Sequence, residues 1–439
     1  MRFVSSAFSK AIVVAGVALL LLIPVQMLRS LILERAQLRE QAIASVSRGW
    51  GGRQLIGGPV LAIPATVTVA DTTIREVQRD WYVLPESLEL ESQLIVQDER
   101  RKLGVYEVPV YLTKVRAQAR FDVATKVAAL TAAQRGVTLH LDRARLLVPV
   151  SDPRGVRNVV SNGNGLANSS FEPQLGFPIA AVSAPLRADT DLRAGGPLSF
   201  DISLEIAGTS SLQFMPLAHS TSLKLVGNWA HPGFSRGFLP TERKVEPERF
   251  EARWQVLDLN RVYGSQWLQG ETAAGALEDS AFGVDLVQPV DLYQQAERSV
   301  KYAGLFIALS LLTLFLWEHL AGQPLHPIQY GLMGLALSVF YLLLLALAEH
   351  IGFPKAYATA AVALCALLGV YIAGAFRSSK AGSGSALAFG TVYALLYLLV
   401  TSEDYSLLAG AIGLFVILAT VMVITRRIDW YGATRKAES

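Results

Sequence analysis

The chain has 439 residues and a formal net charge of +3, and its charged fraction of 17% is below the quarter typical of soluble domains. A mean hydropathy of +0.37 indicates long apolar segments. The small net charge and the lack of a dense Lys/Arg stripe argue against nucleic-acid binding. The only cysteine, Cys365, lies in an apolar run, which excludes disulfides and cysteine-ligated zinc from the polar part of the chain.

Residues 1–28 form the first predicted element, a transmembrane helix. Its apolar core at residues 11–28 follows two basic residues, and no small-residue cleavage site comes after it, so we interpret it as an uncleaved signal anchor. Residues 29–56 continue with helical spacing of apolar and charged residues, which predicts an amphipathic stalk or linker. A helix docked on the next domain fits the same pattern. Glycines at residues 49–52 are expected to end the helix.

Residues 57–297 are predicted to form a large β-rich, antiparallel domain. The Asn-Gly pairs of residues 158–170 indicate a long loop or a hairpin tip, and residues 124–135 indicate a single helix. Many short strands without regular helices between them favour a sandwich-like domain, or two related ones. The apolar or alternating runs that predict these strands, the first two ended by proline, are residues 60–64, 81–85, 88–96, 105–115, 137–148, 200–206, 222–226, 250–256 and 282–287.

Residues 298–427 are predicted to form a bundle of five transmembrane helices, followed by a tail at residues 428–439. Each apolar run is long enough to cross ~30 Å of hydrocarbon. Glu318 and Glu349 stand near the ends of two runs, where we interpret them as interfacial residues. Ionisable residues are missing from the middle of the runs, which argues against a charge-driven transporter. The expected spans are residues 302–318, 328–348, 356–376, 386–401 and 406–425.

The basic residues of the short loops predict the orientation in the membrane. Arg377 and Lys380 lie between the fourth and fifth spans, and the C-terminal tail is also basic, whereas residues 401–404 contain no base. Cytoplasmic loops collect Lys and Arg, so the C-terminus is expected in the cytoplasm. Six spans then place the N-terminus in the cytoplasm as well and the β-rich domain on the outer side.

Residues 233–237 match the Gly-x-Ser-x-Gly pattern of a hydrolase nucleophile elbow. That motif needs a strand before the serine and a helix after it. His231-Pro232 precedes the motif and Pro240 stops any helix, so we expect Ser235 to have no catalytic role. The histidines are isolated from one another, and we expect no metal, no cofactor and no catalytic residue.

The segment from residue 229 to residue 240 is the candidate interaction loop. Aromatic and arginine side chains dominate binding hot spots because they bury a large area and keep a polar group. The alternative is that the aromatic side chains close the bottom of the β domain. The candidate residues of the loop are Trp229, His231, Phe234, Arg236 and Phe238.

Several short stretches, spread in order from the first span to the tail, resemble the CreD family of bacterial inner-membrane proteins. The resemblance implies a protein classed under cell-envelope integrity and tied to a stress-responsive two-component system that affects the response to β-lactams and colicins. It implies no enzymatic activity. The stretches are residues 20–24 (LLLIP), 84–88 (LPESL), 228–232 (NWAHP), 238–240 (FLP), 325–330 (LHPIQY), 340–350 and 428–431 (IDWY).

Together these observations predict a membrane protein with an N-terminal anchor helix, a large periplasmic β-rich domain and a C-terminal helix bundle. We expect a non-catalytic inner-membrane protein that supports envelope integrity and the stress response. Its partners are expected to be the lipid bilayer and a periplasmic or membrane component bound by the periplasmic domain. The alternative is a lipid-handling or small-molecule transport protein that works through the helix bundle.

Overall fold

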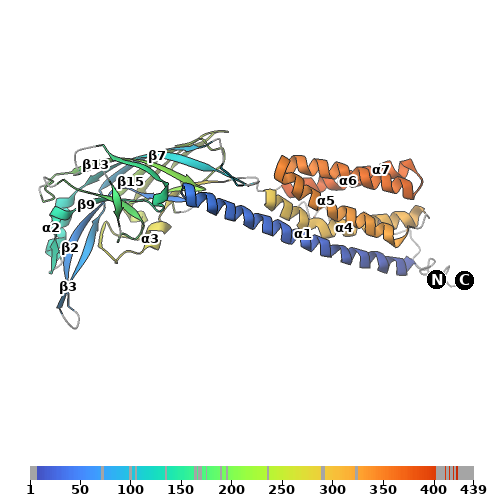
Figure 1. The fold of residues 1–439 in the computed structure, drawn as a ribbon, viewed down its shortest axis with the longest axis horizontal. Helices are drawn as coiled ribbons and strands as arrows, with labels where there is room; N and C mark the ends of the chain where they lie inside the picture. The colour runs from blue at the N-terminus through green and yellow to red at the C-terminus, as the bar shows by residue number, and fades with distance from the viewer. Residues whose placement is uncertain are drawn as a thin grey trace. The chain divides into compact units, whose positions relative to one another are not determined.

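The computed structural model divides the chain into two compact units (Figure 1). Met1–Arg39 with Val290–Ser439 is the helical unit, and Glu40–Pro289 is the β unit. After residue 401 the structure describes only residues 411, 415, 419, 422 and 423. Up to there it describes residues 7–401 apart from 71–73, 98–100, 104–105, 134–135, 163–165, 167–170, 175, 188–189, 194–195, 235–236, 288–291 and 322–324.

The described residues contain five helices that are long and apolar enough to cross a membrane. This confirms the predicted anchor helix and four of the predicted C-terminal spans. The fifth, at residues 406–425, lies almost wholly outside the described residues. The helices are α1 (Ala7–Trp50), α4 (Leu292–Ala321), α5 (Pro327–Ile351), α6 (Phe353–Ala375) and α7 (Ser379–Thr401).

Helix α1 joins the predicted anchor and stalk into one continuous helix of 44 residues (Figure 1). At 1.5 Å per residue it is about 66 Å long, roughly twice the hydrocarbon thickness of a bilayer. It ends at Trp50, and Gly51 follows with a φ of +124°, a conformation that side chains other than glycine rarely adopt. The predicted break in the glycine-rich run is confirmed, and strand pairing begins only three residues later, at Gln54.

In the helical unit, helices that follow one another in the chain pack together, with α4 on α5, α5 on α6 and α6 on α7. Helices α6 and α7 meet at small residues: a Cβ atom added to Gly382 would lie 2.5 Å from the Ala373 Cβ and 2.6 Å from the Gly369 carbonyl oxygen. Small residues permit such close approach between membrane helices. Helix α7 starts at Ser379, so residues 379–385, which lie between two of the expected spans, are helical.

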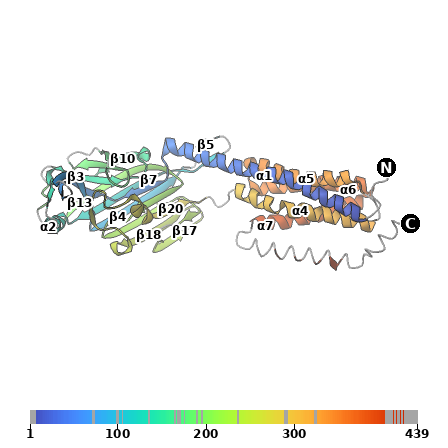
Figure 2. The same cartoon turned by 90° about the horizontal axis from the view of Figure 1, so that it is seen from below.

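The larger part of the β unit is a sandwich of two seven-stranded sheets. The first, which we call the β7 sheet, has its strands side by side in Figure 2. Its order is β10 (Val156–Ser161), β13 (Leu198–Thr209), β7 (Val110–Phe121), β4 (Ser87–Val96), β15 (Ser220–Gly227), β18 (Phe250–Leu257) and β17 (Glu242–Val245).

The second sheet, which we call the β2 sheet, faces the first across a common core that includes Trp81 and Ile63 from one sheet and Leu90 and Val115 from the other. The predicted sandwich is thus confirmed, as one compact unit. The order is β11 (Glu172–Gln174), β12 (Ala181–Pro185), β9 (Arg145–Pro149), β2 (Val60–Ala70), β3 (Ile74–Val83) and β19 (Gln266–Leu268), with β8 (Val137–Leu139) also paired to β2.

The two sheets differ in how their outer faces are covered. A second buried cluster, which includes Tyr82, Phe177 and Trp267, covers the outer face of the β2 sheet, close to the short helix α3 (Ala274–Asp279). The β7 sheet instead shows strict alternation along β4 and β7, with every second side chain exposed. A sheet with one face in solvent produces this pattern.

Smaller elements complete the β unit. Helix α2 (Val123–Ala133) confirms the predicted helix, and β5 (Arg101–Leu103) pairs with β6 (Tyr106–Val108). A four-stranded sheet has the order β1 (Gln54–Gly57), β14 (Ser211–Met215), β20 (Phe282–Leu286) and β16 (Pro232–Gly233). Both chain connections to the helical unit lie at one end of the β unit: Trp50 contacts Tyr111 at the start of β7, and Leu286 bonds to Ser210 beside the end of β13.

The predicted antiparallel pairing is confirmed with two exceptions, and two other strand predictions need correction. Most pairs are antiparallel, but β15 with β4 and β1 with β14 are parallel, which alternation within one strand cannot reveal. Residues 158–161 belong to strand β10 rather than to a loop. Pro64 does not end its strand. The Pro64 carbonyl oxygen accepts a hydrogen bond from the His140 N–H, which lies between β8 and β9. The Pro64 nitrogen, which has no hydrogen to donate, therefore lies where β2 is not paired with either strand.

Candidate functional site

The predicted interaction loop lies at the end of the β unit where the chain connects to the helices. The Trp229 indole N–H donates to the Val287 carbonyl oxygen at 3.1 Å, just after β20. The Phe234 ring packs edge-on against Phe250 and Trp254, with centroids 6.0 and 5.9 Å away. These two aromatic side chains of the loop therefore take part in the packing of the domain.

Phe238 is held in the same way. Its ring lies 6.2 Å from Phe282, and its carbonyl accepts from the Trp254 indole N–H at 3.1 Å. Together with Trp229 and Phe234 it packs, partly buried, against the main core. This packing is the one expected of aromatics that close the end of a domain. His231 is exposed and Arg236 lies outside the described residues, so partner binding by this loop stays a prediction.

The Gly-x-Ser-x-Gly stretch is not surrounded by the secondary structure of a nucleophile elbow. Pro232–Gly233 form β16, which pairs with β20, and residues 237–241 are irregular up to the start of β17. Ser235 lies outside the described residues. The lack of a catalytic role stays a prediction.

Two histidines of the β unit each lie beside a single polar group. His219 Nδ1 lies 2.6 Å from Asp258 Oδ2, and His140 Nε2 lies 2.8 Å from Thr66 Oγ1. Within the ranges that the structure describes, no group of three or more His, Cys, Asp or Glu side chains is placed to hold a metal ion.

The outer face of the β7 sheet carries polar side chains from four neighbouring strands. The strand register places Glu89 of β4 beside Gln118 of β7, which lies beside Asp201 of β13. The next row along the strands brings Glu91 beside Arg116. Alternation in each strand points these side chains away from the core, and the register assembles them into one surface.

This surface, which we call the polar face, contains two neighbouring cavities of about 320 and 330 Å³. Both volumes are within the range of about 300–1,000 Å³ found for small-molecule sites. Residues that line the first cavity include Ser87, Glu89, Gln118, Arg120, Asn162 and Asp201. Residues that line the second include Glu91, Gln93, Lys114, Arg116, Asn158 and Glu205.

A bidentate ion pair separates the two cavities. Arg116 donates from its Nη2 to Asp201 Oδ2 at 2.6 Å and from its Nε to both carboxylate oxygens at 3.1 Å. Gln118 and Asn162 add donors to the same carboxylate at 3.2 and 3.3 Å. The bond from Arg116 holds the pKa of Asp201 below its usual range, with smaller effects of Gln118 and Asn162, so this carboxylate stays ionised and fixed.

Other charged groups that line the cavities are not engaged in this way. Among the described residues, the side chains of Glu89, Lys114, Arg120 and Glu205 make no hydrogen bond or ion pair. Fixed groups thus stand beside donors and acceptors that can turn toward a ligand.

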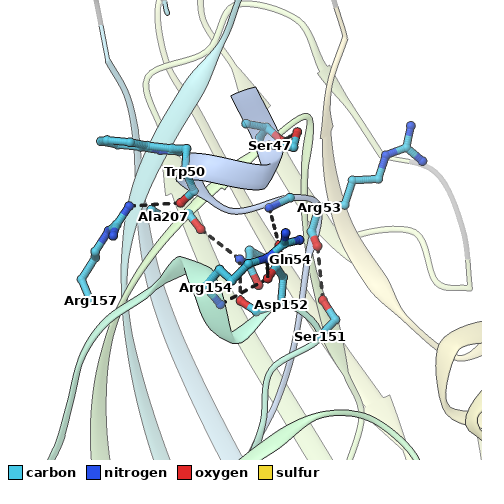
Figure 3. A network of polar contacts seen from close by, with 11 residues as sticks. Ser47, Trp50, Arg53, Gln54, Ser151, Asp152, Arg154, Arg157 and Ala207 are labelled. Carbon is cyan, nitrogen blue, oxygen red and sulfur yellow. Dashed lines mark hydrogen bonds and ion pairs between the residues drawn. The ribbon is translucent and has the colours of Figure 1, made fainter. Parts of the chain in front are cut away.

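The end of α1 is built into the β unit through a polar joint (Figure 3). The Asp152 carboxylate accepts from the Gly52 N–H at 2.8 Å and from the Arg154 Nε at 2.8 Å. The buried Gln54 amide donates to the Ala207 carbonyl at 2.9 Å and to the Asp152 carbonyl at 3.2 Å. These contacts, which we call the α1 joint, surround the three residues that connect α1 to the first strand.

Charged groups of α1 are also paired in the helical unit. Lys10 forms an ion pair with Glu318 of α4, and the Tyr330 hydroxyl of α5 donates to the same carboxylate at 2.5 Å. Glu318 is buried, so the expectation of a merely interfacial residue at the end of a span is wrong for it. The physical reason is that α1 covers it with a cation, which the sequence of α4 alone does not reveal.

A second set of charged and hydroxyl groups, similar to that of Lys10, Glu318 and Tyr330, lies further along α1. Arg35 lies 3.9 Å from Glu349 of α5, which accepts from the Tyr293 hydroxyl of α4 at 3.0 Å. Lys10 and Arg35 are 25 residues apart, about 37 Å along a helix, which exceeds the ~30 Å hydrocarbon layer. The two groups therefore cannot act on one another directly.

Comparison with known proteins identifies the family. The sequence model described as inner membrane protein CreD matches residues 6–431. The chain belongs to the CreD family. It is 34% identical over 439 residues to the inner membrane protein CreD of Escherichia coli (strain K12), an alignment that covers 98% of this chain and 94% of the relative. The resemblance read from the short motifs is confirmed, and CreD membership makes the chain an inner-membrane protein with several apolar helices.

Sequence reasoning did not find the polar face or the α1 joint. The alternation of Glu89 and Glu91 with buried leucines marks an outward face, and that signal was present. It could not reveal which strands lie beside β4, because β13 and β10 follow it by more than fifty residues.

Proposed function

We propose that this CreD-family protein supports the integrity of the cell envelope and the response to envelope stress without catalysing a reaction. It acts by holding its β unit on the periplasmic side of the inner membrane, where the β unit binds an envelope partner. Both chain termini lie in the cytoplasm. The observation that carries the proposal is the polar face. Its two cavities are large enough for a ligand, and they are lined both by the Arg116–Asp201 ion pair and by charged side chains without a hydrogen-bond partner among the described residues.

The α1 joint supports a tethering role. Gly52 and Gln54, just after the end of α1, are bound to Asp152 and Ala207 of the sandwich through three hydrogen bonds. A binding domain attached in this way stays close to the membrane that carries it.

The partner is tested with a photo-crosslinking residue placed in the full-length protein in intact cells. Positions 114 and 120 report on the polar face, and position 259 is the control, because Leu259 is 87% exposed and follows β18 away from the cavities. We expect the same partner to be captured from positions 114 and 120 and not from 259. Equal capture from all three positions, or capture only from the helical unit, would contradict the proposal.

The orientation is tested with reporters that are active only in the cytoplasm. One copy follows Ser439 and another is inserted in the exposed turn between β17 and β18, after Pro247. Activity is expected at the C-terminus and silence in the turn, and the reverse pattern would place the β unit in the cytoplasm.

The absence of catalysis has its own test. Ser235→Ala is expected to leave the envelope phenotype intact, because residues 237–241 do not provide the helix of a nucleophile elbow. Loss of the phenotype at a normal protein level would restore the nucleophile hypothesis.

The second candidate function is lipid handling or small-molecule transport through the helix bundle. It is favoured by the buried Glu318 carboxylate of α4 and by the Glu349 carboxylate of α5, since ionisable groups between membrane helices often serve a transported ligand. The ion pairs that both carboxylates form with α1 are an equally direct explanation of their presence. Glu349→Gln separates the two, because loss of a transport function at full protein stability would support the bundle as the working part.

A further inference from the structure

The chemistry of the polar face restricts the class of ligand that it suits. Its two cavities together present four carboxylates (Glu89, Glu91, Asp201, Glu205) and three cations (Lys114, Arg116, Arg120). This near balance provides no strong field for a polyanion such as a nucleic acid or a phosphorylated polymer. The amide and hydroxyl groups between the charges offer donors and acceptors together, as a ligand rich in hydroxyl groups requires.

The backbone of the polar face argues against a peptide ligand. An extended peptide binds to a sheet by adding a strand at an open edge, where main-chain groups are unpaired. The cavities lie on the face of β4, β7 and β13, whose main-chain groups are already paired with one another across the sheet. A ligand here must bind to side chains.

The lining also disfavours an acyl chain. The side chains that alternation directs outward along β4 and β7 in the cavities are polar or charged, and Val160 of β10 is an aliphatic exception, 37% exposed. A lipid tail is stabilised by about 25 cal/mol for each Å² of its apolar surface that is removed from water. One exposed valine offers too little apolar surface to cover such a tail.

From these features we propose that the polar face binds an uncharged or zwitterionic glycan chain. This inference rests on the proposed function and specifies the partner. Gln118 lines the first cavity and Lys114 lines the second, four residues apart on β7, which is about 13 Å along a strand. A chain of several sugar rings that runs along β7 occupies both cavities, whereas one ring occupies only one.

The polar face is prepared for such a chain in two ways. Arg116, Gln118 and Asn162 hold the Asp201 carboxylate in one position, so that it needs little ordering when a hydroxyl group binds. Glu89 and Lys114 have no partner among the described residues and can accept from, or donate to, hydroxyl groups of the ligand.

The test uses the full-length protein in detergent and a fluorescent N-acetylglucosamine tetramer as the probe, with binding followed by polarisation. We expect saturable binding of the tetramer that is at least tenfold tighter than that of the N-acetylglucosamine dimer. Glu89→Ala and Lys114→Ala are each expected to weaken it at least fivefold. Because these side chains make no hydrogen bond or ion pair among the described residues, the variants should keep the thermal stability of the parent.

Gln255→Ala and Ser222→Ala are matched controls. Both residues lie on the same sheet, in β18 and β15, outside the lining of the two cavities, and both are expected to leave binding unchanged. Absence of saturable binding by the parent protein, equal affinity for dimer and tetramer, or unchanged affinity in Glu89→Ala and Lys114→Ala would each overturn the glycan inference.

The glycan inference can fail while the proposed function holds. If the tetramer does not bind but positions 114 and 120 capture a protease-sensitive partner in cells, the polar face binds a protein and only the ligand class is wrong. If neither the tetramer nor a cellular partner is found at these positions, both proposals fail.

Discussion

The helical unit and the β unit bury charged side chains in different ways. In the helical unit, the buried Glu318 carboxylate of α4 is paired with Lys10 of α1. In the β unit, the buried Arg261 instead donates to main-chain carbonyls, those of Tyr263 and Gly264 at 2.8 Å and that of Ala218 at 3.3 Å.

The difference follows from the backbone. Carbonyl groups in the middle of an α-helix accept bonds from their own helix, so a cation between helices must find a carboxylate. Loops at the end of a β-sandwich leave carbonyls without ladder partners, and one guanidinium, with its five donors, can satisfy several of them. Burial lowers the pKa of Arg261, although nearby Tyr263 and Asp258 oppose the shift. A charge pair in the helical unit should therefore be more sensitive to loss of one partner.

The largest effect is expected from Lys10→Met. It leaves the Glu318 carboxylate buried without its cation, and breaking a buried pair in this way costs about 3–5 kcal/mol. Unfolding of the full-length protein in detergent, followed by titration with a denaturing detergent, measures the loss. In the double variant Lys10→Met/Glu318→Gln most of the loss should be recovered.

Arg29→Met is the matched control for that cycle. Arg29 is 46% exposed and lies 3.7 Å from Glu297, and exposed pairs contribute about 0–1 kcal/mol. A loss in Arg29→Met as large as that in Lys10→Met would show that burial does not set the sensitivity of these pairs.

Gly155→Ala tests the packing of the α1 joint in the β unit. A Cβ atom at this position would overlap the Ala207 carbonyl oxygen and the Gln54 amide, both of which are fixed in the joint. Overpacking against backbone should lower the free energy of unfolding by about 3 kcal/mol. Gly275→Ala in α3 has nothing within 4 Å of its added Cβ and should leave stability unchanged or slightly higher. Equal effects of the two variants on the melting temperature would contradict a tight joint.

Phe234→Ala tests whether the predicted interaction loop is part of the domain. Its ring packs on Phe250 and Trp254 but is only partly buried, so we expect a loss of about 2–3 kcal/mol, below the ~3–5 kcal/mol of a fully buried aromatic. Leu239→Ala, at a side chain 70% exposed, is the control and should have little effect. A melting temperature that holds in Phe234→Ala while the envelope phenotype disappears would instead support a docking loop.

The smallest effect is expected from Asp152→Asn, and it depends on pH. The bond from Arg154 is the main cause that lowers the pKa of Asp152, so the folded state favours the ionised carboxylate. The stabilisation is complete above the unfolded pKa of about 3.9 and is lost as pH falls through the folded value. At pH 7 the variant should lose about 1.5 kcal/mol, the lower end for a hydrogen bond to a charged group.

Chemical unfolding between pH 7 and pH 3 checks this prediction. The parent should lose stability below about pH 4 that Asp152→Asn does not lose, because the variant has no carboxylate to protonate. Asp142→Asn, at a side chain 80% exposed, should follow the parent. Parallel curves for the parent and Asp152→Asn would exclude a contribution of this carboxylate.

The sequence by itself determined the features that depend on local periodicity. Runs of apolar residues located α1 and α4 to α7, because a helix that crosses a membrane needs about 20 consecutive apolar residues, and such a run is visible in the sequence. Alternation located β4 and β7 and told which side chains point outward, because successive residues of a strand face opposite sides. The glycines after Trp50 marked the end of α1, because few other residues adopt the conformation of Gly51.

Only the tertiary structure decided which of these elements lie together. Strand β15 pairs in parallel with β4 although more than a hundred residues separate them, and Glu318 is covered by Lys10 from the other end of the chain. The polar face depends on the same kind of contact, since Glu89, Gln118 and Asp201 come from three strands. Such contacts arise from packing between distant segments, and the periodicity of a single segment contains no information about its neighbour.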